Sequence, residues 1–164
     1  MIKAAIVTMS DKGYKGERED TSAGEIKKLL KEIPADLVKY TIIPDEKEMI
    51  IDTLKELCDT EKVDLIVTTG GTGVGIRDVT PEATKAVIDK DIPGMAEAMR
   101  LESLKKTPYA MISRAVVGIS GATLIINLPG SPKAVRENLA AVVPAIKHTI
   151  EKIKGDTAEC AQEQ

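Results

Sequence analysis

The sequence is poor in the residues from which nucleic-acid binding surfaces are commonly built. Its 164 residues include no Phe or Trp, and Tyr14, Tyr40 and Tyr109 are its only tyrosines. Proteins that bind single strands stack the bases on aromatic side chains and attract the phosphates with a positive field. The formal net charge here is −3. We therefore expect no nucleic-acid partner.

Cysteine and histidine are almost as scarce. Cys58 and Cys160 are the only cysteines and His148 is the only histidine. These numbers exclude a zinc site of the Cys/His kind and a disulfide-stapled scaffold. The helical pattern directs His148 away from the apolar face, so a Ser–His–Asp triad is excluded as well. No apolar run is long enough to cross a membrane and no signal peptide is evident, which indicates a reduced, cytoplasmic protein without membrane association.

What the sequence does contain is an alternation of strand and helix patterns, which predicts an α/β fold. Short continuous apolar runs at residues 4–7 and 65–67 are typical of strands that are buried on both faces, and residues 37–43 form another strand pattern. With 43% hydrophobic and 30% charged residues, the chain has an ordinary globular composition. We predict one domain at residues 1–154, followed by a flexible C-terminal tail at residues 155–164.

The starts of three helices carry capping signals. Ser22 and Glu25 have the spacing of a capping box, and Asp45 with Glu48 forms an N-cap and N3 pair. Thr80 precedes a proline, as an N-cap residue before a proline at N1 does. We expect each of these side chains to cap the helix that follows it.

The second half of the chain predicts a hairpin and two further helices. Residues 115–119 and 123–128 are β-rich runs separated by a short turn signal. The helix at residues 92–104 has apolar residues on several sides, which is typical of burial against more than one neighbour, including another subunit. Ser131 begins the last helix, in which Pro144 does not shift the apolar face and predicts a kink rather than an end.

The strongest local feature is a glycine-rich loop. Gly70, Gly71, Gly73 and Gly75 lie within six residues, directly after the buried strand at 65–67. Glycines let successive backbone N–H groups converge on an anion and remove the side chains that would hold a phosphate away. The spacing is that of neither a dinucleotide-binding loop nor a P-loop. The loop is either an anion site or a turn without a ligand. The density of its glycines and its position after a buried strand favour the anion site.

Two aspartates, Asp45 and Asp78, lie at equivalent places after a strand or loop and before a helix. Helix capping is a sufficient explanation for Asp45 alone, whereas Asp78 lies two residues before the better cap, Thr80. Because carboxylates repel phosphates, aspartates beside a phosphate site make sense only with a divalent cation between them. Asp45 and Asp78 are therefore our candidate metal ligands.

A third candidate is the turn at Pro129, Gly130 and Ser131, where a strand ends and a helix begins. The free N–H groups and the positive end of the helix dipole at such a turn attract anions. The same residues are equally compatible with a well-made helix start that binds nothing.

Taken together, these strings resemble the molybdopterin adenylyltransferases of the MogA/MoaB type, which are related to the G domains of plant molybdenum-cofactor enzymes and of gephyrin. The likeness covers residues 2–155. The strings that carry it are Pro-Asp-Glu from Pro44, Thr-Gly-Gly-Thr-Gly from Thr69, Arg-Asp-Val-Thr-Pro-Glu-Ala-Thr from Arg77, Ser-Arg from Ser113, and Leu-Pro-Gly-Ser-Pro from Leu128.

The resemblance implies a three-layer α/β/α fold with a mostly parallel central sheet, assembled as a homotrimer. It implies transfer of AMP from ATP to the terminal phosphate of molybdopterin with Mg²⁺, release of pyrophosphate, and hand-over of the product to a molybdenum-insertion protein. By the resemblance, Asp45 and Asp78 are catalytic and bind the metal, and Ser113 contributes to the molybdopterin site. We expect the other substrate-binding residues to be Ser10, Gly70, Gly71, Thr72, Gly73, Pro129, Gly130 and Ser131.

Two alternatives to an enzyme stay open. A module of this fold could bind pterin or nucleotide without turning it over, or it could serve as a trimeric scaffold. A scaffold does not require both aspartates beside an intact glycine loop. Release of pyrophosphate from ATP in the presence of molybdopterin distinguishes the enzyme from both.

Overall fold

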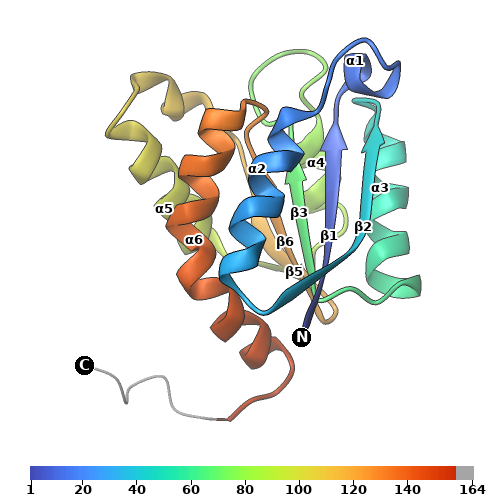
Figure 1. Ribbon diagram of the computed structural model, residues 1–164, viewed down its shortest axis with the longest axis vertical. Helices are drawn as coiled ribbons and strands as arrows, with labels where there is room; N and C mark the ends of the chain where they lie inside the picture. The colour runs from blue at the N-terminus through green and yellow to red at the C-terminus, as the bar shows by residue number, and fades with distance from the viewer. Residues whose placement is uncertain (158–164) are drawn as a thin grey trace.

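The computed structural model describes residues 1–157, so Cys160 and most of the expected C-terminal tail lie outside the described residues. Its centre is a six-stranded sheet in the order β2-β1-β3-β6-β5-β4 (Figure 1). β1, β2, β3 and β6 pair in parallel, and β5 pairs antiparallel with both of its neighbours. The strands are β1 (Ile2–Met9), β2 (Ala35–Ile43), β3 (Leu65–Thr69), β4 (Lys90–Asp91), β5 (Val117–Ser120) and β6 (Thr123–Leu128).

Helices cover both faces of this sheet, which confirms the three-layer α/β/α arrangement. The helices α2, α5 and α6 pack on one face of the sheet, and α3 and α4 pack on the other (Figure 1). The helices are α1 (Asp11–Tyr14), α2 (Thr21–Leu29), α3 (Lys47–Lys55), α4 (Thr80–Lys85), α5 (Pro93–Leu104) and α6 (Pro132–Ile153), with short helical segments η1 (Leu30–Glu32), η2 (Glu56–Thr60) and η3 (Pro108–Ile112).

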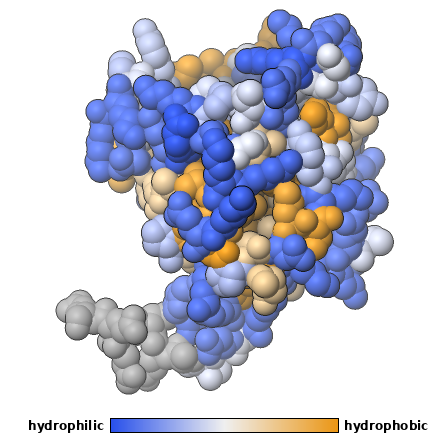
Figure 2. Space-filling view, in the orientation of Figure 1, coloured by the Kyte–Doolittle hydropathy of each residue, from blue (hydrophilic) through white to orange (hydrophobic). Residues whose placement is uncertain are grey.

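Each face of the sheet has its own hydrophobic core, because successive side chains of a strand point to opposite faces. In β1, Ile6 packs with the cluster that includes Ile26 of α2, whereas Val7 packs with the cluster that includes Ile50 of α3. The outer surface over α2 and α6 is mostly hydrophilic, with separate apolar patches (Figure 2). No helix in residues 1–157 is long and apolar enough to cross a bilayer.

The three capping expectations are wrong, and in each case the side chain is engaged by a more distant part of the chain. Asp20, not Ser22, caps α2, and the buried Ser22 hydroxyl donates to the Gly130 carbonyl at 2.7 Å. Thr80 is the first residue of α4 rather than its cap, and its hydroxyl donates to the Gly70 carbonyl at 2.9 Å. The helix α3 begins after Glu46, so Asp45 does not cap it.

Other local expectations fare better. The hairpin is confirmed as β5 and β6, and α6 continues through Pro144 after a cap at Ser131, whose hydroxyl accepts from the Ala134 N–H at 3.2 Å. The stretch between β1 and α2 contains the short helix α1, capped by Ser10. In α5 the apolar residues do point to several sides, because Met99 is buried and Leu101 is exposed.

The parallel strands bring the sequence motifs to one edge of the sheet. Ser10 follows β1, Asp45 follows β2 after one residue, Gly70 follows β3, and Pro129 follows β6. Since these four strands run in the same direction, their carboxyl ends lie at the same edge, which is the usual ligand edge of an open α/β sheet.

Candidate active site

Two adjoining pockets open at this edge of the sheet. The first, which we call the Asp45 pocket, has a volume of about 390 Å³, and the second, the Ser113 pocket, about 380 Å³. Gly71, Asp78 and Gly130 line both pockets and form the wall that they share. A molecule in one pocket would therefore meet a molecule in the other at these three residues.

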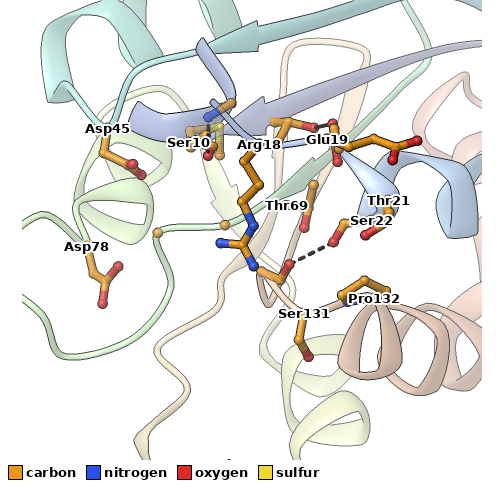
Figure 3. Close-up of a pocket in the computed structure, with 17 residues that line it drawn as sticks. Ser10, Arg18, Glu19, Thr21, Ser22, Asp45, Thr69, Asp78, Ser131 and Pro132 are labelled. Carbon is orange, nitrogen blue, oxygen red and sulfur yellow. Dashed lines mark hydrogen bonds between the residues drawn. The ribbon is translucent and has the colours of Figure 1, made fainter. Parts of the chain in front are cut away.

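The structure brings all eleven residues that we expected at the site to these two pockets. Ser10, Asp45, Gly70 and Ser131 line the Asp45 pocket alone, and Thr72, Gly73, Ser113 and Pro129 line the Ser113 pocket alone. Their binding and catalytic roles stay predictions. Figure 3 shows Asp45 and Asp78 on one side of the Asp45 pocket, with Ser22 and Ser131 on the other.

The glycine loop has a backbone that other residues cannot adopt without strain. Gly70 and Gly71 have φ values of +96° and +66°. A Cβ atom on Gly70 would collide with the Met9 carbonyl oxygen, and one on Gly71 would collide with Oγ1 of Thr80. The same Cβ on Gly71 would lie 3.2 Å from Oδ1 of Asp45. Glycine here keeps the backbone close to the aspartate and leaves the space open.

Hydrogen bonds hold this loop to the first residue of α4 and to β6. Besides the bond from its hydroxyl to Gly70, Thr80 donates its backbone N–H to the Gly71 carbonyl at 3.1 Å. The Gly70 N–H donates to the Leu128 carbonyl at 3.1 Å. The loop is therefore an ordered part of the pocket wall.

Arg114 fixes the outer half of the loop, a role that sequence reasoning missed. Its backbone N–H donates to the Thr72 carbonyl at 2.9 Å, and its guanidinium donates to the carbonyls of Gly73 and Asp78, both at 2.7 Å. The guanidinium also forms an ion pair with Glu82. The only sequence signal was the position of Arg114 beside Ser113 in a matching string.

Asp45 is held by Asp11 at the start of α1. The Asp11 N–H donates to Oδ2 of Asp45 at 3.0 Å, and the Asp45 N–H donates in return to Oδ1 of Asp11, also at 3.0 Å. Arg77 binds both carboxylate oxygens of Asp11, at 3.0 and 2.9 Å, and reaches Glu46 at 2.8 Å. This network orients Asp45 without using its Oδ1 atom.

Asp78 is anchored in a similar way, because its Oδ2 atom accepts from the Gly75 N–H at 2.9 Å. Within residues 1–157, neither Oδ1 of Asp45 nor Oδ1 of Asp78 has a hydrogen bond. Each aspartate therefore has one oxygen fixed by the backbone and one oxygen left for a ligand.

Burial raises the pKa of the half-buried Asp45 carboxyl, and the negative charges of Asp11 and Asp78 raise it further. The hydrogen bond from Asp11 and the charge of Arg77 act in the opposite direction. The influence of Asp78 on Asp45 means that the two carboxylates are near enough to repel each other. A cation between them would relieve this repulsion.

The donor set fits magnesium better than zinc. The described part of the chain contains no group of three or more His, Cys, Asp or Glu side chains that could hold a metal ion. Asp45 and Asp78 alone could supply two carboxylate oxygens to a metal ion, and the other ligands of that ion would be phosphate oxygens and water. Mg²⁺ usually binds in this way, with one or two carboxylates and substrate phosphates.

The Asp45 pocket also offers groups that suit an anion directly. Ser131 lies at the N-terminus of the 22-residue helix α6, whose free N–H groups and dipole favour negative charge at this end. The Ser131 hydroxyl caps the helix, and the Ser10 hydroxyl likewise accepts from the Gly13 N–H at 2.9 Å.

The Ser113 pocket has a different character, which the sequence did not reveal. Tyr109, Ala110 and Ile112 of η3 line it, together with polar side chains of α5 and α6 such as Arg100 and Asn138. A site with apolar sides and a few fixed polar groups suits a flat ring with a polar edge. Arg100 and Asn138 were missed because they lie on helices whose pattern signals only packing.

The sequence of the chain matches a known protein family. The family model described as a probable molybdopterin binding domain matches residues 5–148 of the chain. The chain belongs to this family. The matched residues include all of the glycine loop, both aspartates and the Ser131 turn, which confirms the resemblance inferred from the motifs.

Relatives of known name agree with this membership. The molybdopterin adenylyltransferase of Helicobacter pylori is 45% identical over 157 residues, covering 94% of this chain and 89% of that protein. The molybdopterin adenylyltransferase of Escherichia coli is 41% identical over 147 residues, covering 88% and 75%. A structure of the molybdopterin biosynthesis enzyme MoaB from Thermus thermophilus superposes with a TM-score of 0.90 at 48% identity, covering 95% of this chain and 98% of that one.

Proposed function

We propose that this protein is a molybdopterin adenylyltransferase of molybdenum cofactor biosynthesis. It transfers AMP from ATP to the terminal phosphate of molybdopterin and releases pyrophosphate. The observation that carries the proposal is the shared wall of Gly71, Asp78 and Gly130, because two substrates in adjoining pockets would meet there. The names of the relatives supply the identity of the substrates.

The chemistry of each pocket supports a different substrate for each. ATP fits the Asp45 pocket, where backbone N–H groups, the start of α6 and a cation held by two aspartates would face its phosphates. Molybdopterin fits the Ser113 pocket, where Tyr109 and Ile112 would cover the pterin and polar groups such as Asn138 would bind its edge. The α-phosphate of ATP and the terminal phosphate of molybdopterin then lie at the shared wall.

The reaction needs no nucleophile from the protein. An oxygen of the molybdopterin phosphate forms a bond to the α-phosphorus of ATP. The bond from this phosphorus to the oxygen that bridges to the β-phosphate breaks, and pyrophosphate leaves with the electron pair. The protein has to align two polyanions and to compensate their charge, so positioning and electrostatic stabilisation account for the catalysis.

The residues of the chain divide this work. The amides of the glycine loop approach the phosphates closely because Gly71 and Gly73 have no side chain. The N–H groups of Asp11 and Gly75 fix the Oδ2 atoms of Asp45 and Asp78, which leaves the two Oδ1 atoms for a ligand. A magnesium ion bound to these Oδ1 atoms would neutralise charge on the phosphates.

The decisive experiment is an assay of pyrophosphate release by the purified protein with ATP, molybdopterin and MgCl₂. We expect release that depends on all three components, with formation of adenylylated molybdopterin. Binding of both substrates without release would instead identify a binding module. Absence of binding to either substrate would leave only a scaffold role for the fold.

A further inference from the structure

The arginines of the chain differ in whether they already have a partner. Arg18 is the only one of the five arginines that forms no hydrogen bond or ion pair within residues 1–157. The other four are engaged by carboxylates or carbonyls: Arg77 by Asp11 and Glu46, Arg100 by the Ala115 carbonyl, Arg114 by Glu82 and the glycine loop, and Arg136 by Glu25. Arg18 therefore has its full donor capacity available.

Arg18 is also the only Arg or Lys side chain that lines the Asp45 pocket, as far as the described residues go. Four carboxylates, those of Glu19, Asp20, Asp45 and Asp78, line the same pocket. A pocket with this balance repels a polyphosphate unless cations compensate it, and two of the carboxylates account for one divalent ion. In Figure 3, the Arg18 side chain points into the pocket, between the aspartates and the Ser131 side.

The backbone on either side of Arg18 is fixed. The Glu17 N–H donates to the Lys12 carbonyl at 2.9 Å. On the other side, the Asp20 carboxylate accepts from the Thr8 hydroxyl at 2.6 Å and from the Ala23 N–H at 3.0 Å. A long side chain that starts from an anchored backbone can reach a bound ligand without a rearrangement of the loop.

We propose that the guanidinium of Arg18 binds the β- and γ-phosphates of ATP, which together form the pyrophosphate that leaves. This inference rests on the proposed function. In the proposed function the reacting α-phosphate lies at the shared wall of Gly71, Asp78 and Gly130, whereas Arg18 lines the Asp45 pocket and not the Ser113 pocket. The planar guanidinium matches pairs of phosphate oxygens, and it stabilises the negative charge that develops on pyrophosphate as the bond to the α-phosphorus breaks.

The test measures equilibrium binding of ATP, AMP and inorganic pyrophosphate, each with Mg²⁺, to the wild-type protein and three variants. We expect Arg18→Ala to weaken binding of ATP and pyrophosphate by about tenfold to a hundredfold, as the loss of hydrogen bonds to a charged group does. Binding of AMP, which lacks the β- and γ-phosphates, changes by less than about threefold because only a distant, screened charge is lost. Arg18→Lys recovers part of the affinity, since it restores the charge without the planar donor pair.

Lys12→Ala is the matched control, because it removes the same charge from the neighbouring helix α1 at a side chain that does not line the pocket. Equal affinities for ATP in wild type and Arg18→Ala overturn the inference, as does an equal loss for AMP and ATP or an equal loss in Lys12→Ala. Molybdopterin binding should be unchanged in all variants. A wild-type protein that binds neither ATP nor pyrophosphate overturns the proposed function itself, which distinguishes the two failures.

Discussion

Asp11 and Asp45 hold each other through a pair of reciprocal hydrogen bonds, in which the backbone N–H of each residue donates to the carboxylate of the other at 3.0 Å. The negative charge of Asp11 raises the pKa of the Asp45 carboxyl, but Arg77 binds both oxygens of Asp11 and lowers the pKa of the Asp11 carboxyl. The negative charge of Asp11 is thus balanced inside the network, and Oδ1 of Asp45 stays available to the pocket.

The first prediction concerns the charges of Asp45 and Asp78. Asparagine keeps an oxygen that can accept from the N–H of Asp11 or Gly75, so Asp45→Asn and Asp78→Asn should fold normally with melting temperatures close to that of the wild type. If the charges hold a cation on the phosphates, each substitution should lower the rate of transfer by a factor on the order of 10²–10³. Single-turnover adenylyl transfer across a Mg²⁺ titration measures this effect.

The control for these variants is molybdopterin binding without metal, which should survive both substitutions. Wild-type rates of transfer in both variants would contradict the catalytic assignment and favour a binding module.

The second prediction concerns Arg114, which ties the carbonyls of Gly73 and Asp78 together. Arg114→Met removes both bonds and the ion pair with Glu82, so the free energy of unfolding should fall by about 1–3 kcal/mol. The loop should also become less ordered, which weakens binding in both pockets because Asp78 lines both. Urea denaturation and equilibrium binding of ATP and of molybdopterin measure the two effects.

Arg114→Lys separates this geometric role from simple charge. A single ammonium group cannot reproduce the planar set of donors, so lysine should restore little of the binding. Full rescue by lysine would mean that only the positive charge at this position counts.

The position of the site could be predicted from the sequence, whereas its internal bonding could not. Gly70 and Gly71 follow a buried strand, and parallel strands end at the same edge of a sheet, so the convergence of the motifs follows from topology. The capping signals of Ser22 and Thr80 were misleading because their hydroxyls donate to the carbonyls of Gly130 and Gly70, which belong to other motifs. Such bonds depend on the tertiary packing, and no local pattern encodes them.

The third prediction is the assembly. Leu101 of α5 and Met111 of η3 are exposed apolar side chains that line neither pocket, with exposed fractions of 63% and 72%. We expect a second and a third copy of the chain to cover these side chains in a homotrimer, as the family resemblance implies. Light scattering at micromolar concentration should give three times the 17.6 kDa of one chain.

A matched pair of variants tests which surface is used. Met111→Glu places a charge among the exposed apolar residues and should dissociate the trimer, whereas Met49→Glu, at another exposed methionine, should not. A wild-type protein that scatters as a monomer would refute the assembly.

The last prediction tests whether transfer needs the open space beside a glycine of the loop, without a change in the backbone conformation of the loop. Substitutions of Gly71 cannot do so, because its φ of +66° and the collision with Thr80 strain any variant as a whole. Gly73 has no positive φ, and a Cβ atom there would lie 2.8 Å from Oδ2 of Asp78 and meet little else. Gly73→Ala should therefore push the Asp78 carboxylate away from the Gly75 N–H while the fold stays intact. We expect the rate of transfer to fall by about tenfold or more, because a small displacement of a positioning group is costly. The melting temperature should stay close to that of the wild type.

Gly24→Ala in α2, whose Cβ would meet open space, is the control that should keep full activity. Wild-type transfer by Gly73→Ala would mean that the position of Asp78 does not limit the reaction.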